Sequence, residues 1–227
     1  MRLYLSSFRL GERPEELSGL LGRAAVGCPV GVVANAMDAA PGEVRRAGVE
    51  RECAALAGLG LAPVEVDLRG WFGAEPGAVA EELARYPVVW VRGGNVFVLR
   101  EALARSGADA VLAGMVRRDE LVYAGYSAGP AVLAESLRGL EGCDDPGDVA
   151  VAYGEGAVVR WDGLGVLDYM VVPHVDSPGH PESEALGRVA AGYRRTGVPH
   201  RTLRDGQVLV VRGGVTTLHP DGAESGE

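Results

Sequence analysis

The chain has 227 residues, of which 47% are apolar and 23% are charged, and its formal net charge at pH 7 is −9. This length suffices for one well-buried core, so we expect a single α/β domain over residues 1–227. The negative charge, with no cluster of lysine and arginine to offset it, excludes nonspecific nucleic-acid binding. No apolar run is long enough to cross a bilayer, so we expect no membrane partner.

The N-terminal segment and the cysteines indicate the cellular compartment. Arg9 interrupts what would be the apolar core of a signal peptide. The three cysteines (Cys28, Cys53 and Cys143) are an odd number and lack the spacing of metal ligands. Reduced thiols are typical of the cytoplasm, so we expect a cytoplasmic protein.

Apolar segments alternate with helical patterns along the first half of the chain. In chain order, a strand is predicted at 3–7, a helix at 13–23, a strand at 30–36, a helix at 43–59, a strand at 63–68, a helix at 78–85, a strand at 87–91, a helix at 95–105 and a strand at 120–126. Near-continuous apolar strands that alternate with helices indicate a mostly parallel sheet with helices on both faces, a three-layer α/β fold.

The pattern changes after residue 133. A loop rich in aspartate and glycine occupies 141–156, and strands are predicted at 157–161 and 169–174. A helix is predicted at 182–196, and strands at 206–212 and 215–218 flank two glycines. These last two strands predict an antiparallel C-terminal hairpin.

The segment from Val122 to Leu133 carries the clearest chemical motif. It is an apolar strand, then Gly125-Tyr126-Ser127-Ala128-Gly129, then a helix that tolerates Pro130 in its first turn. This order is typical of a nucleophile elbow, in which the serine lies at the tip of a sharp turn. The alternative is an ordinary turn between a strand and a helix.

A serine nucleophile needs a base, and histidine is the usual one. His180, His200 and His219 lie in predicted loops and turns, whereas His174 ends an apolar strand. Ligands bind at the carboxyl ends of strands in open α/β sheets, so His174 is expected at the same edge of the sheet as Ser127. A purely structural role for His174 is the alternative.

The base in turn needs a carboxylate to orient it. The loop between the serine and the histidine contains Asp144, Asp145 and Asp148, and we rank Asp144 first and Asp148 last. Adjacent acids before Pro-Gly are more often turn residues that face solvent.

Acyl transfer also requires donors to the developing oxyanion. The amide of Ala128 is one candidate, and the amide of Gly94, between a strand and a helix, is the other. Asn95 follows as a candidate substrate contact. The alternative is a plain turn in which Asn95 caps the helix.

Taken together, Arg92-Gly93-Gly94-Asn95, Gly125-Tyr126-Ser127-Ala128-Gly129, Asp144-Asp145-Pro146 and Val172-Pro173-His174 occur in one order. In this the chain resembles the peptidase E family of serine peptidases, which includes α-aspartyl dipeptidase and, more distantly, cyanophycinase. The resemblance implies a fold like that of the class I glutamine amidotransferases. It implies a Ser-His-Asp triad and hydrolysis of short peptides from the N-terminal side, without metal or cofactor.

The resemblance also bears on specificity. The dipeptidase selects an N-terminal aspartate through an arginine in the helix after the histidine, which corresponds here to Arg188. Pro130 and the segment 175–182 depart from the dipeptidase pattern, so a broader aminopeptidase or dipeptidase is an open alternative. The expected partners are short peptides, and a homodimer is one option for the assembly.

Two other functions remain open. An esterase of the α/β-hydrolase type shares the Gly-x-Ser-x-Gly motif and the order of serine, aspartate and histidine. Against it, His174 follows Ser127 closely in the sequence, and no His-Gly-Gly motif precedes the elbow. A noncatalytic amidotransferase-like binding module is favoured if no aspartate reaches His174.

Overall fold

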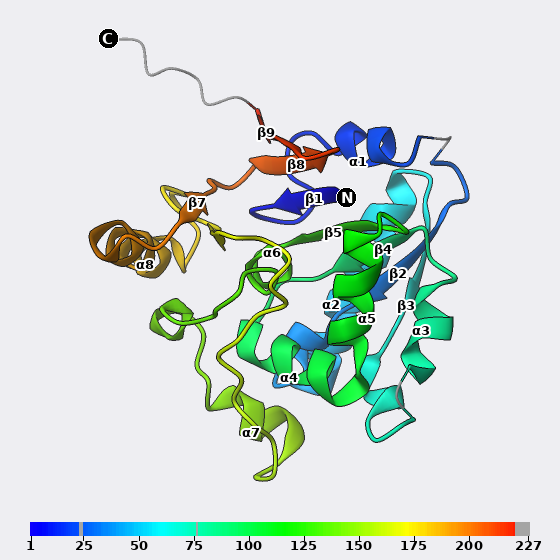
Figure 1. The fold of residues 1–227 in the computed structure, drawn as a ribbon, viewed down its shortest axis with the longest axis horizontal. Helices are drawn as coiled ribbons and strands as arrows, with labels where there is room; N and C mark the ends of the chain where they lie inside the picture. Colours follow the sequence, from blue (N-terminus) through cyan, green and yellow to red (C-terminus); the bar gives the residue numbers. More distant parts are fainter. Residues whose placement is uncertain (23–24, 76, 221–227) are drawn as a thin grey trace.

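The computed structural model describes residues 1–22, 25–75 and 77–220. Its centre is a seven-stranded sheet with the strand order β3-β2-β4-β5-β1-β8-β9 (Figure 1). The strands are β1 (Arg2–Ser6), β2 (Pro29–Val33), β3 (Ala62–Glu65), β4 (Val88–Val91), β5 (Val122–Tyr126), β8 (Val208–Arg212) and β9 (Val215–His219). The first five are parallel, and β8 and β9 form an antiparallel hairpin beside β1, which confirms the predicted fold class.

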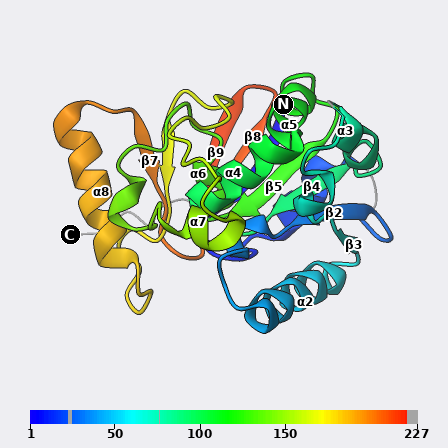
Figure 2. The same ribbon diagram turned by 90° about the horizontal axis from the view of Figure 1, so that it is seen from below.

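Helices cover both faces of this sheet. The helices of the described residues are α1 (Glu15–Leu20), α2 (Gly42–Gly58), α3 (Ala78–Leu83), α4 (Val96–Ser106), α5 (Ala108–Arg117), α6 (Ala128–Ala131), α7 (Asp148–Tyr153) and α8 (Ser183–Thr196). Successive side chains of a strand point to opposite faces, so Leu3 and Leu5 pack in one core with Phe97 of α4. Tyr4 packs in the other core with Leu56 of α2. Figure 2 shows α2 on one side of the sheet and α4 and α5 on the other.

The second half of the chain differs from its prediction in three places. The strand expected at 157–161 is absent, and only an isolated bridge between Ser136 and Asp162 lies nearby. Helix α7 forms inside the expected loop at 141–156. The strand expected at 169–174 is shorter, β6 (Met170–Val172), and pairs with β7 (His200–Thr202) in a separate two-stranded parallel sheet.

Most of the remaining boundaries lie within a few residues of expectation, but α5 and β7 occupy positions for which no element was predicted. Helix α1 spans only part of the predicted 13–23, and residue 23 lies outside the described residues. Three short 3-10 helices, η1 (Asn35–Met37), η2 (Leu68–Trp71) and η3 (Leu140–Gly142), complete the connections. Within the described residues, the helices are too short or too polar for one of them to cross a membrane.

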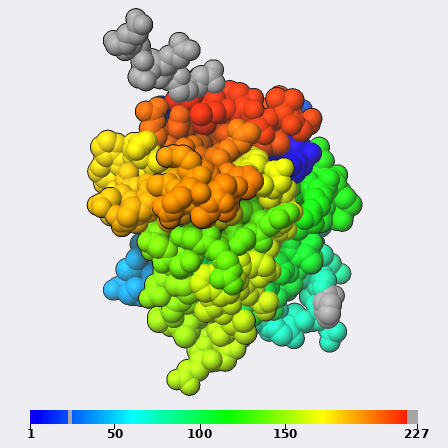
Figure 3. Space-filling view, turned by 60° about the vertical axis from the view of Figure 1, so that its left-hand side comes forward, coloured from blue at the N-terminus to red at the C-terminus, as the bar shows by residue number. Residues whose placement is uncertain are grey.

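The connections after β5 gather beyond the carboxyl ends of the parallel strands. Helices α6 and α8 lie past this end of the sheet in Figure 1. Helix α8 packs against η3, and Figure 3 shows the yellow-to-orange segment around α8 beside the green surface that follows β5. This cover encloses the end of β5, where ligands of open α/β sheets bind.

Candidate active site

Ser127 lies at a sharp turn between β5 and α6. Its φ is 52° and its ψ is −109°, a conformation that residues other than glycine rarely adopt. A Cβ at Gly125 would lie 2.3 Å from the carbonyl oxygen of Val91, and one at Gly129 would lie 2.4 Å from the same atom. Larger residues would therefore displace β4, and the turn has the strained backbone and close packing of a nucleophile elbow.

His174 lies just past the end of β6 and also has a positive φ, of 58°. Its backbone N–H donates to the Ser7 hydroxyl at 2.9 Å. Ser6, which precedes Ser7 and ends β1, accepts the N–H of Ser127 through its carbonyl oxygen at 3.3 Å. Two adjacent serines at the end of β1 thus bring Ser127 and His174 to the same end of the sheet, although β6 belongs to the smaller sheet.

The carboxylate beside His174 comes from a residue that the sequence analysis missed. Asp205 lies in the turn between β7 and β8, and its Oδ1 is 2.6 Å from His174 Nδ1. The same oxygen accepts the Ser7 hydroxyl at 3.0 Å, and the Asp205 N–H donates to the Ser177 hydroxyl at 2.8 Å. These bonds hold the carboxylate at Nδ1, which leaves Nε2 for the general-base role.

The acids predicted to orient His174 have other partners. Asp144 Oδ2 accepts the N–H of Val96 at the start of α4 at 2.8 Å. Asp145 is exposed and accepts the N–H of Gly147 at 2.8 Å within its own turn. The prediction placed the acid between serine and histidine along the chain, whereas Asp205 follows the histidine. Its sequence context, Asp-Gly before a strand, is that of an ordinary turn and gave no signal.

The surroundings of His174 favour its neutral form. Burial lowers the pKa of His174 from its ordinary value, although the Asp205 carboxylate acts in the opposite direction. The His180 ring stacks on it with centroids 3.6 Å apart and planes 3° from parallel, and the Phe8 ring meets it edge-on at 5.8 Å. A neutral, firmly packed imidazole at pH 7 can accept a proton.

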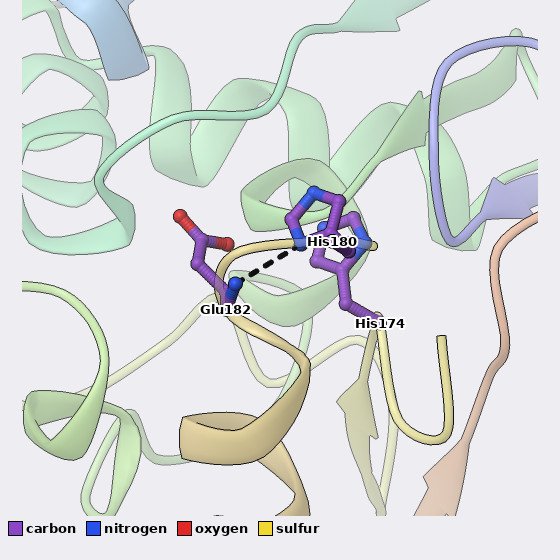
Figure 4. Close-up of side chains that lie close together, drawn as sticks. All are labelled: His174, His180 and Glu182. Atoms are coloured by element: carbon purple, nitrogen blue, oxygen red, sulfur yellow. Dashed lines mark hydrogen bonds between the residues drawn. The ribbon is translucent and has the colours of Figure 1, made fainter. Parts of the chain in front are cut away.

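Among the residues that the structure describes, two groups of possible metal ligands lie at this end of the sheet, and both include Glu182. His174, His180 and Glu182 have ligand atoms within 4.8 Å of one another (Figure 4). Their imidazole planes are parallel, so the in-plane lone pairs of the two rings do not converge on one ion. The second group adds Cys143 and Asp144 to Glu182. Burial and these two carboxyls raise the pKa of the Cys143 thiol to about 12, so this thiol is protonated at neutral pH.

The candidate oxyanion donors meet at the elbow. Gly94 has φ +145°, and a Cβ there would lie 2.6 Å from the Ala36 carbonyl oxygen. A Cβ at Gly93 would lie 2.8 Å from the Ser127 Cβ, so the Gly93-Gly94 turn packs directly against the nucleophile. Ala128 follows Ser127 in α6. The Gly93-Gly94 turn and Ala128 therefore both lie next to Ser127.

Asn95 caps helix α4, which is the structural role that the sequence analysis gave as the alternative to a substrate contact. Its Oδ1 accepts the N–H groups of Phe97 and Val98, which makes it the N-cap of α4. Its Nδ2 donates to the Asp145 carbonyl oxygen at 2.8 Å and to Asp148 Oδ2 at 3.1 Å. These bonds use its polar atoms and attach the 141–156 segment to α4, which argues against the predicted contact with substrate.

A small cavity opens beside Ser127. Its volume is about 20 Å³, and its lining consists of Val96, Ser127, Ala128, Ala131, Leu140, Cys143, Asp144, Pro173, Glu182 and Leu186. Burial raises the pKa of Asp144 to about 7, and the nearby Glu182 adds to this, whereas the Val96 N–H opposes it. The cavity lining thus contains two carboxyl groups, whose charged forms a bound cation would stabilise.

Arg188, the predicted specificity residue, lies outside this cavity. Its side chain is 66% exposed and pairs with Glu184 on the same helix. It lines a separate groove with Val189 and Tyr193, where α8 meets Arg138 and Gly142. Leu186 faces the Ser127 cavity, and two residues along a helix correspond to a rotation of about 200°, which points Arg188 away from it.

Comparison with known proteins gives consistent results. Residues 43–219 match the model of peptidase family S51. An uncharacterized peptidase of Listeria innocua is 26% identical over 162 residues, which cover 71% of this chain and 72% of the relative. An uncharacterized peptidase of Listeria monocytogenes is 26% identical over 145 residues, or 64% of this chain and 65% of the relative.

Solved structures share the fold. The crystal structure of a candidate peptidase E from Listeria monocytogenes has a TM-score of 0.76 and 21% identity, and the match covers 96% of both chains. A peptidase from an acI-B1 actinobacterium has a TM-score of 0.66 and 14% identity, over 96% of this chain and 86% of the other. Since the family model covers most of the sequence, this chain belongs to peptidase family S51, the peptidase E family of serine peptidases.

Proposed function

We propose that this protein is an aminopeptidase or dipeptidase that cleaves short peptides from their N-terminal end. The observation that carries the proposal is the hydrogen bond between His174 and Asp205 at the end of the sheet that holds Ser127. A carboxylate at Nδ1 orients the imidazole and stabilises its protonated form during the reaction. The noncatalytic alternative required a histidine without such a carboxylate.

In the first half of the reaction, Ser127 Oγ attacks the carbonyl carbon of the scissile peptide bond. Its proton passes to His174 Nε2, and the carbonyl oxygen becomes an oxyanion that accepts the N–H groups of Gly94 and Ala128. Asp205 stabilises the resulting imidazolium. The C–N bond then breaks, and the imidazolium returns the proton to the leaving amine.

In the second half, a water molecule attacks the ester formed on Ser127. His174 takes a proton from this water and then gives it to the serine oxygen as the acid product leaves. No group beyond the chain and water is needed to balance these steps.

The cavity at Ser127 supports action at a free N-terminus. A volume of about 20 Å³ is close to that of one water-sized group, which is also the size of an ammonium group. Asp144 and Glu182 on its wall supply the negative charge that a substrate α-ammonium would pair with. The raised pKa of Asp144 means that a bound cation would recover part of the cost of burying this carboxylate.

The same carboxyl groups argue against selection of an N-terminal aspartate. An aspartate side chain would bring a third carboxylate to the site, and Arg188 lines a different groove. We therefore favour neutral first residues over an Asp-X preference.

The test is a panel of dipeptides that differ in the first residue. Ala-Leu and Leu-Leu should be cleaved, Asp-Leu should be cleaved more slowly, and N-acetyl-Ala-Leu should be resistant because it lacks the ammonium group. Ser127→Ala should abolish turnover while circular dichroism and the melting temperature stay near those of the wild-type protein.

Arg188→Ala is the matched control for specificity. It removes an exposed ion pair outside the cavity, so the ratio of Asp-Leu to Ala-Leu turnover should not change. Fast cleavage of Asp-Leu that depends on Arg188, or equal cleavage of the acetylated peptide, would contradict the proposed binding of the N-terminus.

A further inference from the structure

Arg92 occupies an unusual position for a buried cation. It directly follows β4 and precedes Gly93 and Gly94, and its side chain is 11% exposed. Its Nη1 donates to the carbonyl oxygen of Gly93, the next residue, at 2.8 Å. The side chain thus forms a hydrogen bond with the backbone of the turn that contains Gly94, one candidate oxyanion donor.

The bonded carbonyl and the donor belong to one peptide group. The Gly93 C=O and the Gly94 N–H are the two ends of a planar unit, and in a trans peptide they point in opposite directions. A donor fixed on the carbonyl therefore fixes where the N–H points. It also polarises the peptide, because hydrogen bonds in series strengthen one another.

Glu52 holds Arg92 on the face of the sheet that α2 covers. It projects from α2, its side chain is 6% exposed, and its Oε1 is 3.7 Å from Arg92 Nε. Nε is buried and has no hydrogen-bond partner. The attraction between the two charges therefore offsets the cost of removing this part of the guanidinium from water. The close approach of α2 depends on Gly48, where a Cβ would lie 3.2 Å from Arg92 Nη2.

The same carboxylate contacts both strands that lead into the oxyanion donors. Glu52 Oε2 accepts Trp90 Nε1 of β4 at 3.0 Å, and Oε1 accepts the hydroxyl of Tyr126 at 3.0 Å. Tyr126 directly precedes Ser127, and Trp90 lies two residues before Arg92. One buried group therefore fixes the spacing between the elbow and the Gly93-Gly94 turn.

We infer that Arg92, held by Glu52, is a positioning residue that orients the Gly94 amide toward the oxyanion. The inference rests on the serine mechanism proposed above. Arg92 does not touch the substrate in this scheme. It acts through the peptide group whose N–H does.

The test compares wild-type protein with Arg92→Met. Two rates are measured: kcat and KM for Ala-Leu, and the second-order rate at which a fluorophosphonate probe labels Ser127. Both the kcat and the labelling rate should fall about 10- to 100-fold, less than the full loss of an oxyanion donor at its upper range. The KM should change less than threefold, because the Gly94 amide contributes mainly to the transition state.

Arg100→Met is the matched control. Arg100 has a side chain that is 6% exposed, and its ion pairs are with Asp109 and Asp162, outside the site. Arg100→Met should lose about as much stability as Arg92→Met but keep the wild-type kcat and labelling rate. Equal rates for Arg92→Met and wild type, or an equal fall for Arg100→Met, would overturn the inference.

A second variant keeps the test valid if Arg92→Met fails to fold. Arg92→Met leaves Glu52 without its countercharge, whereas the double variant Glu52→Gln/Arg92→Met leaves no unpaired buried charge. It should melt at a higher temperature than Arg92→Met and react as slowly, and recovery of the wild-type labelling rate in it would count against the role of Arg92. Labelling of the wild-type protein without peptide cleavage would overturn only the peptidase assignment. A wild-type Ser127 that is not labelled at all would overturn both.

Discussion

Replacement of Asp205 by asparagine tests which acid serves His174. The carboxylate contacts the imidazole at 2.6 Å and is 27% exposed, so the pair lies near the surface. Unit charges about 4 Å apart interact by about 4 kcal/mol in such surroundings. Asp205→Asn removes this stabilisation of the imidazolium in the transition state, so kcat should fall by about three orders of magnitude.

The measurement is kcat and KM for Ala-Leu in Asp205→Asn, with Asp144→Asn as the comparison. Asp144 contacts the Val96 amide and lines the Ser127 cavity, so its loss should raise KM and lower kcat less than tenfold. The reverse outcome, with Asp205→Asn within tenfold of wild type and Asp144→Asn a thousandfold slower, would refute the assignment and restore the acid expected from the sequence.

The remaining predictions concern pH and packing. Because the pKa of His174 lies below its ordinary value and the base acts when deprotonated, kcat should be constant near neutral pH and fall only in the mildly acidic range. The profile of kcat/KM should show a further fall near pH 7, where the free Asp144 takes up a proton, and Asp144→Asn should remove that step. Gly125→Ala places a Cβ 2.3 Å from the Val91 carbonyl oxygen and should cost roughly 1–3 kcal/mol in urea unfolding. Gly58→Ala in α2, with open space around its Cβ, should instead be neutral or slightly stabilising, and equal losses would show that the contact at Val91 is not the cause.

The parts of the site that lie on a single continuous motif could be predicted from the sequence. Gly125 and Gly129 flank Ser127 at a fixed spacing, and the backbone of β4 next to them explains why both must be glycines. The Gly93-Gly94 turn is likewise a local feature between a strand and a helix. The near-continuous apolar strands, separated by helices, then suffice to place both turns at the carboxyl end of a parallel sheet.

The parts that depend on the direction of a side chain could not be predicted. Arg188 lies on the expected helix, but helix rotation directs it outward, and no pattern in the sequence fixes that rotation for a residue next to the apolar face. Asp144 was expected to reach an imidazole and instead bonds the start of α4. Both errors concern the contact partner of a polar side chain, which is determined by tertiary packing and not by the local sequence.

The pairing of β6 with β7 explains why the acid comes from so far along the chain. Beyond the paired residues, the Leu203 N–H donates to the Val172 carbonyl oxygen at 2.9 Å, and the Val175 N–H donates to the Leu203 carbonyl oxygen at 3.0 Å. These two bonds keep the segments after β6 and β7 side by side, so His174 on one meets Asp205 on the other. The acid need only reach Nδ1, so it can lie either before or after the histidine in the sequence. The small sheet, which no local motif predicts, therefore sets the geometry of the base as directly as the elbow sets that of the nucleophile.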